Sequence, residues 1–308
     1  MKWNKKALLT IEELTSEEIN YILQTAYSFK EISLRPVKKV PALRGKTIVN
    51  LFFEPSTRTK TSFELAAKRL SADVLNFEVI TSSISKGETI VDTVKNIEAM
   101  KVDCFIVRHK ISGAAEIISK EVQSAVINAG DGCHEHPTQA LLDIFTLKEH
   151  FGEISGLKVA IIGDIFHSRV ARSNIWGLTK LGANVRLCAP ATFIPPGIDK
   201  VCPSIFYRVE DAIKNVDAVY LLRVQKERQQ ENFFPSMEEY SSLYEFNVQR
   251  RGLIRSKFVI MHPGPMNRGI EIKSDVAEKE NSLILKQVTN GIAVRMAVLY
   301  LTVGQFNG

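Results

Sequence analysis

Hydroxyl side chains and an arginine stand together where an apolar run gives way to a helical pattern. The run TIVNLFF ends, Pro55 breaks it, and a helical pattern begins at Ser56. The hydroxyls of Ser56, Thr57 and Thr59 lie beside the N–H groups that the first turn of a helix leaves without partners, and Arg58 adds a planar fork of donors. An ordinary serine cap beside a surface arginine is the alternative. The position between a strand and a helix favours a phosphate site without glycines.

A second helix start follows another apolar run, in the segment NAGDGCHEHPTQ. His136 can donate a hydrogen bond to a carbonyl oxygen, and Gln139 can bind an amide-like group. A single histidine at such a position is usually only a cap, but two such helix starts favour a shared site. Arg108 directly follows the run DCFIV, and its charge is expected to face the same crevice, although a surface arginine is the alternative.

Buried runs alternate with helical patterns along the whole chain, which predicts parallel sheets flanked by helices. The expected strands are TIVNLFF, DVLNFEV, DCFIVRH, AVINAG, LKVAIIGD, NVRLCAP, AVYLLR and FVIMHPG. The expected helices are Thr15–Lys30, with a Thr15–Glu18 capping box, and then Ser56–Leu70, Glu88–Met100, Pro137–His150, Ser168–Leu181 and Gly291–Leu301.

The fold class is therefore α/β, with two doubly wound parallel-sheet domains and an active site in the crevice between them. The long helix that ends at His150 and the turn at Gly152 mark the expected boundary. Residues 1–150 form the first domain and residues 151–290 the second, and the C-terminal helix within 291–308 packs back on the first domain.

Composition excludes several classes of protein. The chain has 308 residues, 45% hydrophobic and 24% charged, as in soluble globular proteins, and it has no apolar run near the roughly 20 residues of a membrane span. Its N-terminus does not resemble a secretory signal, which predicts a cytoplasmic protein. The net charge of +6 comes from scattered residues rather than a tract, which argues against nucleic acid. The glycine after KVAII, Gly163, lacks the further glycines of a dinucleotide fingerprint.

The four cysteines are expected to be buried small hydrophobic residues in a reducing compartment. None forms a CxxC pair, and no Cys or His cluster has the spacing of a zinc site, so no metal is expected.

These pieces together resemble the aspartate and ornithine carbamoyltransferase family. The family pattern is a Ser-Thr-Arg-Thr loop, here Ser56–Thr59, a His-Pro-x-Gln helix start, here His136–Gln139, and an arginine after an intervening strand, here Arg108. The resemblance spans nearly the whole chain. It implies that these residues bind carbamoyl phosphate, with Arg58, Thr59, Arg108 and His136 as the catalytic residues, and that the reaction uses no cofactor and no metal.

The acceptor is expected to be L-aspartate. The loop TSSISKGET resembles that of the aspartate enzymes, whose lysine, here Lys86, the ornithine enzymes lack. Arg169 follows one strand of the second domain, and Arg223 and Gln225 follow another. The α- and β-carboxylates of aspartate need such cations as partners, and the side-chain ammonium group of ornithine does not. A mobile polar loop is the alternative for TSSISKGET considered alone.

The segment HPGPMNRGIEI also matches the aspartate enzymes, and the carbonyl groups of Gly264 and Pro265 are expected to bind the carbamoyl NH2. The reaction implied is attack of the aspartate amine on carbamoyl phosphate, an early step of de novo pyrimidine (UMP) biosynthesis. An ornithine-like acceptor is the alternative, and a non-catalytic anion-binding or nucleic-acid-binding protein is a rival from another class. Glu54 is expected to pair with Arg169 or Arg228 when the domains close.

The resemblance further implies a homotrimer in which Ser82 and Lys86 reach into the neighbouring subunit. It leaves open whether regulatory or dihydroorotase chains join the assembly. Two positions depart from the family pattern: Lys60 stands where an arginine is usual, and Ser71 where a glycine is usual.

Overall fold

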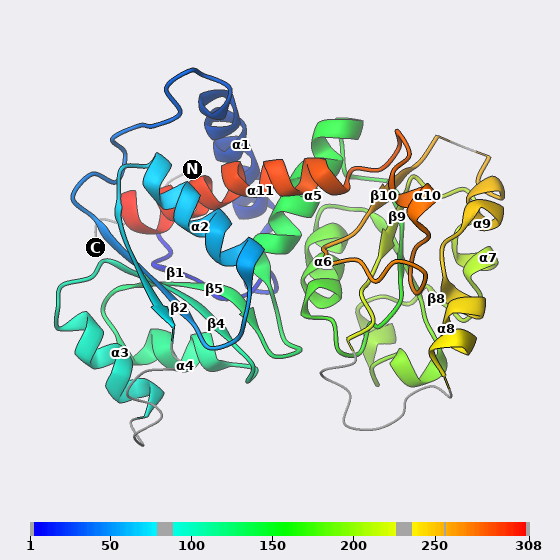
Figure 1. The fold of residues 1–308 in the computed structure, drawn as a ribbon, viewed down its shortest axis with the longest axis horizontal. Helices are drawn as coiled ribbons and strands as arrows, with labels where there is room; N and C mark the ends of the chain where they lie inside the picture. Colours follow the sequence, from blue (N-terminus) through cyan, green and yellow to red (C-terminus); the bar gives the residue numbers. More distant parts are fainter. Residues whose placement is uncertain (1–2, 79–88, 226–235, 256, 306–308) are drawn as a thin grey trace. The chain divides into compact units, whose positions relative to one another are not determined.

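The computed structural model describes residues 3–78, 89–225, 236–255 and 257–305. The chain forms two compact units, Met1–Leu142 with Thr289–Gly308, called unit 1 here, and Asp143–Val288, called unit 2. Each unit contains a five-stranded sheet, and every strand pairing in both sheets is parallel (Figure 1). The predicted α/β class with two parallel-sheet domains is confirmed.

The sheet of unit 1 has the order β1-β5-β4-β2-β3. Its strands are β1 (Ala7–Leu8), β2 (Thr47–Phe52), β3 (Asp73–Glu78), β4 (Cys104–His109) and β5 (Ala125–Asp131). The helices that begin in this part of the chain are α1 (Ser16–Ser33), α2 (Thr57–Arg69), α3 (Ile90–Glu98), α4 (Ala114–Glu121) and α5 (Pro137–Phe151). The chain ends with α11 (Ile284–Leu299) and a π-helical turn, η6 (Tyr300–Gly304). The division between the units falls inside α5 and α11.

Helices cover both faces of the sheet in unit 1, with α3 and α4 on one face and α1 and α2 on the other (Figure 1). Alternate residues of β2 and β4, such as Val49, Leu51 and Phe105, form a buried cluster with Val94 of α3 and Ile118 of α4. Burial on both faces explains why these strands are continuous apolar runs rather than alternating patterns.

The first helix begins at a capping box, as the sequence predicts. The Thr15 hydroxyl accepts a hydrogen bond from the Glu18 N–H at 3.2 Å, and the Glu18 carboxylate accepts one from the Thr15 N–H at 2.9 Å. These reciprocal bonds satisfy two N–H groups that the helix itself cannot use.

The sheet of unit 2 has the order β10-β9-β6-β7-β8. Its strands are β6 (Lys158–Ile162), β7 (Asn184–Cys188), β8 (Ile205–Phe206), β9 (Ala218–Leu221) and β10 (Val259–Met261). The helices are α6 (Arg169–Lys180), α7 (Val209–Ala212), α8 (Met237–Tyr244), α9 (Val248–Gly252) and α10 (Ser274–Ala277), with short 3₁₀ turns η3 (Ala191–Phe193) and η4 (Ile198–Lys200). Among the described residues, no helix is both long and apolar enough to cross a membrane.

The cysteines have no disulfide partners. Cys104, Cys188 and Cys202 are buried and Cys133 is half-buried. Burial raises the pKa of Cys104, that of Cys188 to about 12 and that of Cys202 to about 11. The expectation of small buried residues is therefore confirmed for three of the four.

Ser71, one of the two departures from the family pattern, follows the C-terminus of α2 with a left-handed φ of 67°. Glycine is common at this position because it has no Cβ to strain the left-handed backbone. The serine offsets its strain with a hydrogen bond, because its Oγ donates to the Val40 carbonyl at 2.9 Å.

This balance of strain and hydrogen bonding predicts different effects on stability for two substitutions of Ser71. Ser71→Ala keeps the strain and loses the hydrogen bond, so we expect the free energy of unfolding to fall by about 1 kcal/mol. Ser71→Gly loses the bond but relieves strain of about 1 kcal/mol, so it should leave stability almost unchanged. Urea unfolding of both variants and the unchanged protein measures the difference. A glycine variant no more stable than the alanine variant would contradict this account.

Candidate active site

Three neighbouring strands of unit 1 lead into the predicted phosphate and carbonyl residues. Strands β5, β4 and β2 lie side by side in the sheet. Ser56–Thr59 follow β2, Arg108 lies at the end of β4, and His136–Gln139 follow β5. Since the carboxyl ends of parallel strands share one edge, the topology gathers these residues along that edge of the sheet.

The start of α2 offers donors to an anion. Ser56 is the N-cap residue with an extended backbone, and its hydroxyl makes no capping hydrogen bond to the helix. Thr57 and Arg58 are exposed and Thr59 is buried. The first N–H groups of a helix have no intrahelical acceptors, so they are available to an anion at this end.

Arg108 contacts two residues of the β2–α2 segment. Its Nη1 donates to the Thr59 hydroxyl at 3.5 Å and to the Ala129 carbonyl at 3.2 Å. Its Nε lies 2.7 Å from Oε1 of Glu54, forming an ion pair. The structure thus brings together two of the predicted catalytic residues, Thr59 and Arg108.

Glu54 has a partner within unit 1 that the sequence did not indicate. In the structure Glu54 pairs with Arg108. Its pairing with Arg169 or Arg228 on closure of the domains stays a prediction, and Arg228 lies outside the described residues. The register places Arg108 directly beside Phe52, two residues before Glu54. Only the neighbouring positions of β2 and β4 identify this partner, and sequence spacing alone does not reveal which strands are neighbours.

His136 and Gln139 lie at the start of α5. His136 is buried, immediately before Pro137, the first residue of the helix. Its carbonyl accepts hydrogen bonds from the N–H groups of Gln139 at 3.0 Å and Ala140 at 3.3 Å. Proline suits this position because its missing N–H would have no partner there. Gln139 is half-buried.

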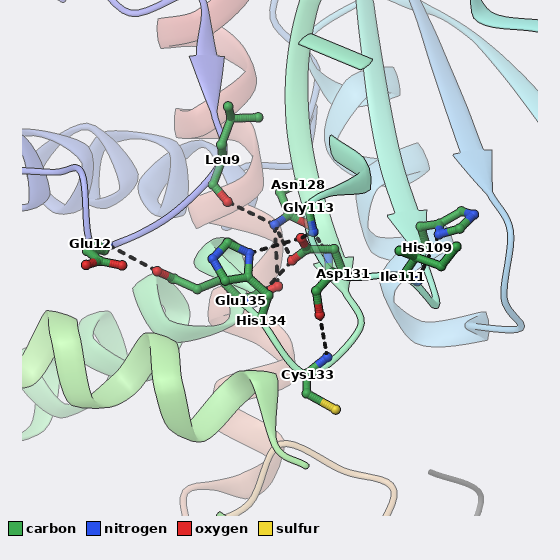
Figure 2. Close-up of polar contacts among 12 residues, drawn as sticks. Leu9, Glu12, His109, Ile111, Gly113, Asn128, Asp131, Cys133, His134 and Glu135 are labelled. Carbon is green, nitrogen blue, oxygen red and sulfur yellow. Dashed lines mark hydrogen bonds and ion pairs between the residues drawn. The ribbon is translucent and has the colours of Figure 1, made fainter. Parts of the chain in front are cut away.

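The turn that leads to His136 is built around Asp131 (Figure 2). Its Oδ2 accepts from the Gly113 N–H at 2.6 Å and lies 3.0 Å from His134 Nδ1. Its Oδ1 accepts from Asn128 Nδ2 at 2.8 Å and the Glu135 N–H at 3.1 Å. Burial by itself would raise the pKa of Asp131, but the bonds from His134, Asn128 and Gly113 outweigh it and lower the pKa.

Glu135, the residue before His136, holds the N-terminal segment (Figure 2). Its carboxylate accepts from the Ile11 N–H at 2.8 Å and the Glu12 N–H at 3.2 Å. Neither Asp131 nor Glu135 is among the residues predicted from the sequence. The available signal was two acidic residues within a turn that joins a buried strand to a largely buried helix.

In unit 2, Arg169 is the first residue of α6 and is only 3% exposed. Ser168 caps the helix, its Oγ accepting from the Ala171 N–H at 3.1 Å. The preceding loop is fixed by Asp164, whose Oδ1 accepts from the His167 N–H and lies 2.8 Å from His167 Nδ1. The other oxygen, Oδ2, accepts from the Gln225 N–H at 3.2 Å, so the loop after β6 is joined to the segment after β9.

The remaining predicted residues of unit 2 follow the next strands of the sheet. Arg223 and Gln225 are half-buried after β9, and β9 lies between β6 and β10. Gly264 and Pro265 follow β10, with Gly264 half-buried and Pro265 exposed. Three adjacent strand ends of unit 2 therefore carry the residues predicted to bind the acceptor and the carbamoyl group.

Two predicted residues, Ser82 and Lys86, lie outside the described part of the chain. Within the described part, no three His, Cys, Asp or Glu side chains are grouped as metal ligands.

Comparison with known proteins identifies the family. The carbamoyl-phosphate-binding domain of aspartate/ornithine carbamoyltransferases matches residues 6–149, and the aspartate/ornithine-binding domain matches residues 155–302. The chain belongs to the aspartate/ornithine carbamoyltransferase family. It is 55% identical over 304 residues to the aspartate carbamoyltransferase catalytic subunit of Syntrophotalea carbinolica, covering 99% of this chain and 97% of that protein. It is 53% identical over 307 residues to that of Moorella thermoacetica, covering both chains completely.

Solved structures of the carbamoyltransferase family share the fold. Aspartate transcarbamoylase from Trypanosoma cruzi, in complex with carbamoyl aspartate and phosphate, is 27% identical with a TM-score of 0.87, over 98% of this chain and 96% of that one. Ornithine carbamoyltransferase from Pyrococcus furiosus is 30% identical with the same TM-score, over 99% of each chain. The fold is thus common to both branches of the family and does not by itself distinguish the acceptors.

The Asp131 turn predicts a pH-dependent stability. Because the folded pKa is lowered, the carboxylate stabilises the native state above its ordinary pKa of 3.8, and this contribution is lost as the pH falls through the lower folded value. Asp131→Asn should therefore lower the free energy of unfolding by about 1–3 kcal/mol at pH 7. The difference from the unchanged protein should stay constant down to about pH 5 and shrink below about pH 4.

Denaturant unfolding at a series of pH values measures this difference. Asp73→Asn is the matched control, because Asp73 is an exposed carboxylate of the same unit. A destabilisation by Asp131→Asn that is the same at pH 7 and below pH 4 would rule out the charge-assisted bonds as its cause.

Proposed function

We propose that this protein is the catalytic subunit of an aspartate carbamoyltransferase, which forms N-carbamoyl-L-aspartate and phosphate from carbamoyl phosphate and L-aspartate. Identity above 50% to catalytic subunits of that name, over the whole chain, carries the proposal. The reaction is an early step of de novo pyrimidine biosynthesis. The free cysteines, three of them buried, fit a reducing compartment, and we infer a cytoplasmic location.

We assign carbamoyl phosphate mainly to residues of unit 1. Ser56–Thr59 bind the phosphate through hydroxyls, guanidinium and backbone N–H groups, and the missing capping hydrogen bond of Ser56 at the start of α2 supports this role. Arg108, with Thr59 and His136, donates to the carbamoyl oxygen, and the contact between Arg108 and Thr59 supports this role. Gln139 binds the carbamoyl group, and Gly264 and Pro265 of unit 2 accept hydrogen bonds from its NH2.

We assign the carboxylates of aspartate to Arg169, Arg223, Gln225 and Lys86. The positions of the first three after adjacent strands support this assignment. The aspartate amine then attacks the carbamoyl carbon, a C–N bond forms, and the tetrahedral intermediate collapses as the C–O bond to phosphate breaks. The departing phosphate takes the proton from the amine, and donors aimed at the developing oxyanion lower the barrier.

The ion pair between Glu54 and Arg108 has a consequence for this mechanism. Nε of Arg108 lies 2.7 Å from Oε1 of Glu54, and Nη1 of Arg108 donates to the Thr59 hydroxyl and the Ala129 carbonyl. Glu54 therefore restricts the orientation of the guanidinium before substrate arrives. Such preorganisation lowers the cost of fixing the side chain in the transition state.

The direct test is a carbamoylation assay with two acceptors. Supplied with carbamoyl phosphate, the protein should release phosphate with L-aspartate and not with L-ornithine. Phosphate release with ornithine alone would favour the alternative acceptor, and release with neither would refute a carbamoyltransferase activity.

Arg223→Ala provides the second arm of this test. Loss of one charge-assisted bond should raise the dissociation constant for aspartate by about tenfold or more, while the constant for carbamoyl phosphate changes much less. Calorimetric titrations with carbamoyl phosphate alone, and with aspartate in the presence of inorganic phosphate, measure the two constants without turnover. Arg172→Ala is the control, since Arg172 lies on the same helix as Arg169 but carries no assigned role. Equal weakening of both ligands by Arg223→Ala would contradict the assignment.

We further propose a homotrimer in which Ser82 and Lys86 complete the site of the neighbouring subunit. The support is the resemblance of the loop TSSISKGET to that of the aspartate enzymes. The proposal is compatible with binding of regulatory or dihydroorotase chains to this trimer.

Subunit mixing tests the shared site. Lys86→Ala and Arg108→Ala proteins should each be nearly inactive. After dissociation and reassembly together, each mixed trimer contains one interface with both residues intact, so roughly one site in three should recover. Native mass spectrometry confirms that mixed trimers form. Mixed trimers without recovered activity would mean that each loop serves its own chain.

A further inference from the structure

The segment after β10 contains a single N–H group across three residues. Pro263, Gly264 and Pro265 offer three carbonyl groups, and only Gly264 has an N–H, because proline lacks one. Gly264 has a left-handed φ of 63°. The orientation of the assigned carbonyl groups of Gly264 and Pro265 therefore depends on what holds this short segment in place.

His262 takes the one N–H of the segment. Its side chain is buried, and its Nδ1 accepts a hydrogen bond from the Gly264 N–H at 2.8 Å. A ring nitrogen that accepts from an N–H cannot itself carry a proton, so the proton of His262 lies on Nε2. Nε2 is 3.2 Å from Oε1 of Glu271 and donates to it.

Glu271 holds the other end of the segment with the same oxygen. Oε1 also accepts from the Asn267 N–H at 2.5 Å, and the Glu271 side chain is buried. The pair His262–Glu271 therefore binds the backbone at Gly264 and again at Asn267. The assigned carbonyl groups of Gly264 and Pro265 lie between these two fixed points.

Further contacts anchor the pair inside unit 2. The His262 N–H donates to Oε1 of Gln287 at 3.0 Å, and Nε2 of Gln287 donates to Asp143 at 2.7 Å. Asn267 Nδ2 donates to the Val224 carbonyl at 3.4 Å, between Arg223 and Gln225. The segment after β10 is thus connected to the segment that carries the assigned acceptor residues.

We propose that His262 and Glu271 are positioning residues that set the carbonyl groups of Gly264 and Pro265 to receive the NH2 of the carbamoyl group. This inference rests on the proposed function. Neither side chain needs to touch substrate, because each acts through the backbone that it binds. The pair should distinguish carbamoyl phosphate from inorganic phosphate, because only the former has an amino group to donate.

Two amide substitutions of His262 separate positioning from packing. An asparagine places its amide oxygen close to the position of Nδ1, so it can still accept from Gly264. A glutamine fills more of the volume of the ring and reaches toward Glu271, but offers nothing at the Nδ1 position. We expect His262→Gln to raise the dissociation constant for carbamoyl phosphate by about tenfold, and His262→Asn to raise it by about threefold or less.

The matched measurement is the dissociation constant for inorganic phosphate, obtained by calorimetry on the same proteins. It should change less than twofold in both variants, because the phosphate residues Ser56–Thr59 belong to unit 1. Glu278→Gln is the surface control, since Glu278 is an exposed carboxylate paired with Arg268 in the same unit. A glutamine variant that binds carbamoyl phosphate as well as the asparagine variant, or a parallel loss for phosphate, would overturn the proposal.

Glu271 provides a second pair of variants that does not depend on the folding of the His262 proteins. Glu271→Gln keeps an amide oxygen for His262 Nε2 and the Asn267 N–H, whereas Glu271→Leu has similar volume and no acceptor. The leucine variant should lose affinity for carbamoyl phosphate about tenfold more than the glutamine variant. Equal affinities for the two variants would show that Glu271 does not position the segment.

The unchanged protein separates a failure of this inference from a failure of the proposed function. If it binds carbamoyl phosphate no more tightly than phosphate and does not carbamoylate aspartate, the proposed function fails. If it does both and the variants behave alike, only the role of His262 and Glu271 fails.

Discussion

Asp143 is fully buried in α5, and a carboxylate there is tolerated because both of its oxygens accept hydrogen bonds. Its Oδ2 accepts from the Tyr220 hydroxyl at 2.6 Å and from Asn174 Nδ2 at 2.9 Å, and its Oδ1 accepts from Gln287 Nε2. These donors come from β9, α6 and α11. Asp143 thereby holds three elements together. Arg169 lies in α6, Arg223 follows β9, and α11 contacts the segment after β10 through Gln287.

Buried carboxylates that require hydrogen-bond donors also fix the structure of unit 1. Asp131 and Glu135 are buried carboxylates, and each binds backbone N–H groups of segments far along the chain, at Gly113 and at Ile11. Backbone donors hold a carboxylate more rigidly than flexible side chains, because they have no rotamers to lose. The position of His136 is therefore determined by two carboxylates that take no part in the proposed chemistry.

Long buried strands and helices with clear start signals were predictable from sequence. TIVNLFF and DCFIVRH became neighbouring strands, and Thr15 with Glu18 made the predicted cap. The last helix begins at Ile284 rather than at the predicted Gly291, and Gly291 lies inside it, where packing tolerates a glycine despite its low helix propensity. Short helices such as α4 and α9 escaped prediction, since four to eight residues are too few for a helical period to be distinct.

The candidate site was predictable wherever one motif held several of its residues, as in Ser56–Thr59. It was not predictable where the partner comes from another strand or from the far side of a loop. Glu54 meets Arg108 and His262 meets Glu271 only after the sheet order and a loop geometry are fixed. Sequence spacing does not identify such partners, because they depend on which strands become neighbours and on how the loop folds.

The four cysteine thiols differ in their expected reactivity toward alkylating probes. Reaction with an alkylating probe requires the thiolate and access to solvent. Burial denies both to Cys104, Cys188 and Cys202, whose pKa values it raises. Cys133 is half-buried in the turn between β5 and α5, three residues before His136. A fluorophore or spin label would therefore attach first at this turn, giving a spectroscopic reporter beside the predicted active-site histidine without any engineered residue.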